Sequence, residues 1–174
     1  MTGRDILEKA ERYIGRKPDE LVVIDGIQEA INWLGNKGYI IDTINVNATA
    51  KQRYDLPSDL IRIIKIENQK ENKYYYNYIL DGNRIRFGDD GEYKIFAEKH
   101  PFLIENIDKD LNLHSMLEGC VLTYVKGHCK VVLDDTSEDG HRLLKKFKED
   151  AVMAYRTLKR GQANPSKVKV IRHA

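Results

Sequence analysis

The chain has 174 residues, of which 41% are hydrophobic and 32% charged, and its formal net charge at pH 7 is +2. This length fits one ordinary domain with a modest core and a large polar surface. It contains no run of about 18 apolar residues and no unbroken apolar stretch near its start, so we expect neither a membrane span nor a secretory signal. Two cysteines, Cys120 and Cys129, are too few for a disulfide framework and fit a reducing compartment.

The charge is distributed unevenly along the chain. Residues 1–140 contain 19 Lys and Arg against 25 Asp and Glu, a net charge of −6, whereas residues 141–174 contain 10 against 2, a net charge of +8. Such a basic end is either a solvated helix with a tail or a surface for an acidic partner, such as nucleic acid, a membrane surface or an acidic protein face. Charge alone leaves these alternatives open.

Two helices are predicted in the first part of the chain. Apolar residues recur at helical spacing over 4–14 and again over 18–35, and both stripes are interpreted as core. Pro18 suits the first turn of the second helix, and the glycine-rich run 35–38 is typical of its C-terminal end.

The middle of the chain, residues 39–98, predicts a central antiparallel β-meander of about four strands. Residues 39–47 form an extended segment or weak strand, and Pro57 introduces an Ile-rich strand. Strict alternation in that strand puts Leu60, Arg62, Ile64 and Ile66 on one face, and both faces are expected to be covered.

A hairpin and a last strand complete the predicted meander. Residues 74–80 and 83–87 flank Asp81-Gly82, which is a tight-turn signal. The run from Gly88 to Gly91 is a second turn, and alternating residues over 93–97 form the last strand, which ends before His100-Pro101.

The C-terminal part is predicted to be helical over 112–132 and 137–160. The first of these is ambiguous over 121–133, where Val, Thr and Tyr favour strands as much as a helix. The second has clear helical spacing, with Thr136 or Ser137 as the cap and Gly161 at its end. Residues 161–174 are polar and basic and are expected to form an extended arm that becomes ordered on a partner.

The sequence offers little evidence of catalysis or of a cofactor. His114, Cys120, His128 and Cys129 are zinc-ligand residue types without zinc-site spacing, and nothing near either cysteine indicates a lowered thiol pKa. The run 88–91 has the wrong charge for phosphate and is read as a turn. We therefore expect no cofactor, no metal and no enzyme activity. A tyrosine and arginine cluster on the hairpin indicates strand packing or subunit contact more than base stacking, and its members are Tyr74, Tyr76, Tyr78, Arg84 and Arg86.

The order of these segments resembles the head–tail connector, or adaptor, proteins of tailed bacteriophages. The resemblance covers nearly the whole chain, through "IQEAINWLG", "RYDLPSDLIRIIKI", "YYYNYILDGNRIRF", "GEYKIFAEKHP" and "LLKKFKEDAVMAYRTLKR". Its sharpest parts are the Tyr-x-Leu-Pro-x-Asp element and the I-x-x-G-x-x-I hairpin. The Val-rich segment 121–133, with Gly127, departs from the helix usual in that family.

The resemblance implies an α+β connector domain over 1–160 and a basic arm over 161–174. It implies a virion protein, assembled in the host cytoplasm, that forms a ring of typically twelve copies beneath the portal protein. The ring would extend the channel for double-stranded DNA and hold tail or nozzle proteins, with no membrane involved. The arm would contact the portal through Lys167, Lys169, Val170, Ile171 and Arg172. The Leu56-Pro57 pair would turn the chain from its helical part into its sheet.

Two other readings remain open at this point. The basic helix 141–160, with Lys145, Lys146 and Lys148, could bind nucleic acid, although Glu149 and Asp150 interrupt the patch. The chain could also be a small enzyme that uses Cys120 or Cys129.

Overall fold

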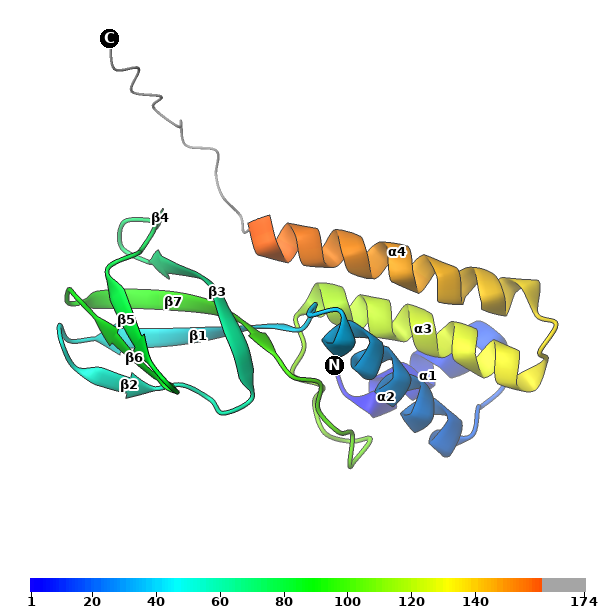
Figure 1. Cartoon of the computed structure of the whole chain (residues 1–174). Coiled ribbons are helices and arrows are strands. Elements are labelled where there is room, and N and C mark those ends of the chain that lie inside the picture. The colour runs from blue at the N-terminus through cyan, green and yellow to red at the C-terminus, as the bar shows by residue number, and fades with distance from the viewer. Residues whose placement is uncertain (161–174) are drawn as a thin grey trace, which may run out of the picture.

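The structure is a computed structural model that describes residues 1–160. Within these residues the chain forms four helices and seven strands, gathered into a helical half and a β half (Figure 1). The helices are α1 (Gly3–Ile14), α2 (Glu20–Asn36), α3 (Ser115–Leu133) and α4 (Glu138–Arg160). The strands are β1 (Ile41–Ala48), β2 (Arg53–Asp55), β3 (Leu60–Asn68), β4 (Lys73–Tyr74), β5 (Tyr78–Asp81), β6 (Arg84–Phe87) and β7 (Gly91–Lys99). The predicted α+β class with an antiparallel meander is confirmed.

Local capping sets the helix boundaries. Thr2 and Asp5 form a capping box at the start of α1. Asp19 accepts a hydrogen bond from the Leu21 amide at 2.8 Å at the start of α2, and Ser137 accepts one from Gly140 at 3.2 Å in the first turn of α4. The predicted helix starts are therefore right to within about three residues. None of the helices within residues 1–160 is long and apolar enough to cross a lipid bilayer.

The ambiguous segment 121–133 is helical and belongs to α3. Leu117, Val121, Val125 and Cys129 recur every fourth residue and are buried in the core of the helical half. Gly127 lets the two C-terminal helices approach closely, because a Cβ there would lie 2.9 Å from the Gly140 carbonyl oxygen. Burial of this face overrides the strand preference of its valines.

The β half contains two antiparallel sheets with a shared core. One has the strand order β1-β7-β3-β4 and the other β2-β6-β5. Phe87 and Tyr93, both fully buried, stack with ring centroids 4.3 Å apart between them. The predicted meander thus has more strands than expected, and the three-residue strand β2 lacks a sequence signal of its own.

Residues 74–80 do not form one continuous strand, so that expectation is wrong. The chain leaves the four-stranded sheet after β4 and enters the three-stranded sheet at β5. Tyr75 lies at the break, where its ring packs against Phe87 and Tyr93 and its hydroxyl donates to Asp89 at 2.9 Å. The predicted turn at Gly82, which has φ +58°, is confirmed.

Strand β3 does not alternate strictly, so the predicted face assignment is also wrong. Its register against β7 shifts between Leu60 and Arg62 and again between Ile63 and Lys65. Because of these two irregularities, the side chains that face the core recur at every third residue instead of every second. Leu60, Ile63 and Ile66 therefore all pack against the β core. Ile61 is 42% exposed, so the strand is not covered on both faces.

The junction between the halves is formed by β1 and β7, which run into the helical half (Figure 1). Tyr39, just before β1, stacks on Tyr155 of α4 with ring centroids 4.5 Å apart. The Leu56-Pro57 pair instead joins β2 to β3, within the β half. The expectation that this pair turns the chain from helices into the sheet is therefore wrong.

Candidate interaction surfaces

The five predicted interface residues lie on two separate surfaces. Tyr74, Tyr76 and Tyr78 line a groove, whereas Arg84 and Arg86 lie on a face of the three-stranded sheet. Tyr74 belongs to the other sheet. Tyr78 lies on β5, where it pairs with the buried Phe87, and this is the face of the sheet opposite to that of Arg84 and Arg86. One predicted cluster therefore becomes two candidate surfaces.

The first surface, which we call the tyrosine groove, has a volume of about 250 Å³. Tyr76 is 80% exposed and Tyr74 is 46% exposed, which is unusual for large aromatic side chains. Lys65 lies at the base, where its Nζ contacts Glu67 at 2.7 Å and sits 4.2 Å from the Phe96 ring centroid. The lining consists of Ile64, Lys65, Ile66, Tyr74, Tyr75, Tyr76, Tyr78 and Lys159.

The second surface, which we call the arginine face, is the outer face of β2, β6 and β5. Two rows of residues cross it in register: Arg53, Arg86 and Ile79 in one row, and Asp55, Arg84 and Asp81 in the other. Arg84 donates to Asp55 at 2.9 Å, and Arg53 lies 3.7 Å from Asp81. Arg86 is in no ion pair among the described residues, and Ile79 beside it is 55% exposed.

A third surface, which we call the acidic hollow, lies between α2 and α3. It has a volume of about 410 Å³ and is lined by Val22, Asp25, Gln28, Glu29, His128 and Val132. Glu29 accepts a hydrogen bond from the Tyr124 hydroxyl at 2.8 Å and lies 3.2 Å from His128 Nδ1. Burial, and then the bond to Glu29, raise the pKa of Tyr124. Asp25 and Val132 remain exposed.

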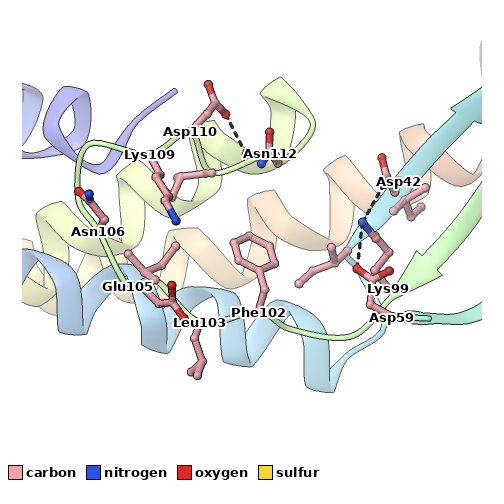
Figure 2. Close-up of a pocket in the computed structure, with 14 residues that line it drawn as sticks. Asp42, Asp59, Lys99, Phe102, Leu103, Glu105, Asn106, Lys109, Asp110 and Asn112 are labelled. Atoms are coloured by element: carbon pink, nitrogen blue, oxygen red, sulfur yellow. Dashed lines mark hydrogen bonds and ion pairs between the residues drawn. The ribbon is translucent and has the colours of Figure 1, made fainter. Parts of the chain in front are cut away.

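A cavity of about 290 Å³ lies at the junction of the two halves. Figure 2 shows Asp42 and Asp59 both reaching Lys99, at 2.9 and 3.0 Å. Burial works to lower the pKa of Lys99, but its bonds to both carboxylates outweigh that effect and raise it. A lysine that two carboxylates keep protonated stabilises the contact between the segments that carry them, and it is a poor nucleophile.

The cysteines have the properties of core residues. Cys120 and Cys129 are 4% and 0% exposed, and burial raises the pKa of each thiol to about 11. Such thiols are almost wholly protonated at neutral pH, which disfavours nucleophilic attack.

His114, another predicted zinc-ligand residue type, caps α3 by accepting a hydrogen bond from the Met116 amide at 3.3 Å. Among residues 1–160, no three His, Cys, Asp or Glu side chains are grouped so as to hold a metal ion.

The basic helix does not present an unbroken cationic stripe. Lys146 lies 2.7 Å from Asp150, one helical turn away. Arg142 pairs with Asp139, which also binds Lys130. These partners reduce the positive potential that a nucleic-acid contact requires.

Sequence reasoning missed the exposed Ile79 and the acidic hollow. The exposure of Ile79 could not be predicted, because alternation of residue types alone does not show which face of an edge strand is covered and which is open to solvent.

The predicted portal-contact residues Lys167, Lys169, Val170, Ile171 and Arg172 lie outside the described residues. No protein-family model matches this sequence, and no curated protein is significantly similar to it.

Proposed function

We propose that this chain is a head–tail connector of a tailed bacteriophage, a non-enzymatic virion protein that forms a ring beneath the portal. One structural observation supports this proposal. The chain has two unlike surfaces on different halves, the basic arginine face with its exposed Ile79 and the acidic hollow with its exposed Val132. The resemblance in segment order is the second support.

Two unlike surfaces are what a closed ring needs. In a ring each copy contacts its neighbour through a heterologous interface, so that one patch meets a different, complementary patch. Arg86 on one copy and Asp25 on the next have opposite charge, and each lies near an exposed apolar side chain. Apolar contact supplies most of the affinity of such an interface, and charge supplies its orientation.

The remaining roles rest on the resemblance to connector proteins. Portal contact is assigned to the arm 161–174, and the opposite side of the ring to tail or nozzle proteins. Double-stranded DNA would pass through the channel without sequence-specific binding. The net charge of +2 suits passage, because each neutralised phosphate adds affinity that slows transit. A copy number of twelve rests on the resemblance alone.

The experiment is light scattering of the full chain, alone and with portal assemblies. A ring is expected in the presence of the portal, and monomers in both conditions would refute the proposal. Arg86→Glu and Asp25→Lys should each weaken the ring, and the double variant should recover it because the charges are exchanged. DNA binding that falls steeply with salt, without any ring, would favour the nucleic-acid alternative.

A further inference from the structure

The tyrosine groove lies where the described chain ends. Lys159, in the last turn of α4, is one of its lining residues, and the C-terminal end of α4 points towards the β half in Figure 1. Fourteen residues follow Arg160. The described part of the chain therefore ends beside a groove that exposes two tyrosine rings.

The groove and this segment are chemically complementary. Residues 166–172, "SKVKVIR", alternate basic and branched apolar side chains. The groove offers Ile64 and exposed tyrosine faces for the apolar side chains. Tyrosine faces also attract cations, as the Lys65 Nζ already shows at 5.5 Å from the Tyr74 ring centroid.

The charged side chains that line the groove are basic. They are Lys65 and Lys159, and Glu67 offsets Lys65 through a contact of 2.7 Å at the base. The segment carries Lys167, Lys169 and Arg172 and no acid. Binding of the segment is therefore assigned to apolar contacts and to the attraction of cations to the tyrosine faces, and charge complementarity does not add to it.

We infer that the tyrosine groove binds residues 166–172 of the same chain when the protein is free. Fourteen extended residues span up to roughly 46 Å, so reach is not limiting. A segment tethered at the rim has a far higher effective concentration than the same segment on another copy, which favours binding within one chain. The inference goes beyond the connector proposal and does not depend on it. If both hold, a portal must displace the segment from the groove.

Paramagnetic relaxation in the full chain tests this inference. A nitroxide is attached to a cysteine introduced by Ala174→Cys, with Cys120 and Cys129 protected from the reagent by burial. Amide signals of residues 74–78 should broaden most. Weak broadening without a maximum at the groove would overturn the inference.

Variants and mixed samples complete the test. Val170→Asp in the segment and Tyr76→Ala in the groove should each abolish the selective broadening, and Tyr76 is exposed enough to change without loss of fold. Ile79→Ala, on the arginine face, is the matched control and should leave the broadening intact. Broadening between a nitroxide-bearing chain and a separate isotope-labelled chain would mean that the groove binds another copy's segment, and this too would overturn the inference.

Discussion

Glu98 of β7 accepts a hydrogen bond of 2.6 Å from Arg62 of β3, and the carboxylate is buried whereas the guanidinium side chain is 64% exposed. The pair lies where the β half meets the helical half. Gly38 packs beneath the carboxylate, and a Cβ at that position would overlap it. The bond to Glu98 raises the pKa of Arg62. A buried carboxylate is thus stabilised by a partner in contact with water, and the backbone at residue 38 must leave room for it.

Gly38→Ala should destabilise the protein more than Gly82→Ala. Both glycines have left-handed backbone, with φ of +67° and +58°, so each substitution adds strain of about 1–2 kcal/mol. Only at residue 38 does the new Cβ also displace the Glu98 carboxylate, since nothing lies within 4 Å at residue 82. Urea unfolding measures the difference. Equal losses of unfolding free energy in the two variants would show that the Glu98 carboxylate can move aside for the new Cβ.

Ile63→Ala should destabilise the protein more than Ile64→Ala, by about 1–2 kcal/mol. The two irregularities in β3 turn Ile63 towards the β core, whereas Ile64 lines the tyrosine groove. Equilibrium unfolding of the two variants checks the register. If Ile64→Ala were instead the more destabilising variant, the result would support the strictly alternating strand that the sequence predicts.

The errors of sequence reasoning occur where tertiary contacts decide the outcome. Helix positions were predictable, because caps such as Ser137 and glycine ends are local signals. The irregularities in β3 and the change of sheet near Tyr75 were not, because both depend on packing against β7 and Phe87. The expected cluster is divided into the tyrosine groove and the arginine face by the change of sheet before β5 and by the two opposite faces of β5 and β6.

Asp139→Asn should destabilise the protein at neutral pH and much less in acid. Hydrogen bonds from Lys130 first, then Arg142 and Tyr13, lower the pKa of Asp139 below its ordinary value of 3.8. A lowered folded-state pKa contributes stability above the ordinary pKa, and this stability is lost as the pH falls through the folded value. The difference between the two proteins should therefore shrink below about pH 4. Asp135→Asn is the control in pH-dependent unfolding, because this exposed carboxylate makes no ion pair among residues 1–160, and it should destabilise the protein less than Asp139→Asn does.

Both cysteines should react slowly with thiol reagents in the folded protein and rapidly once it is unfolded. Burial raises their pKa from 9.0 to about 11. Because the folded-state pKa is raised, the associated stability is complete below about pH 9 and is lost as the pH rises through about 11. The double variant Cys120→Ala and Cys129→Ala should show a shallower loss over this window. Fast labelling of the native protein at pH 8 would instead point to an accessible thiol and revive the enzyme reading.

Ile79→Asp should prevent ring formation without unfolding the protein, if the connector proposal holds. Ile79 is 55% exposed on the outer face of an edge strand, so its replacement removes no core contact. In the ring it would become buried beside the neighbour's acidic hollow, where an added carboxylate is repelled and desolvated. Met153→Asp is the control, because Met153 is 59% exposed on α4 and lies outside the residues that line the hollow and the arginine face. Light scattering with portal assemblies should show rings for the control alone. Rings formed equally by both variants would remove the arginine face from the interface.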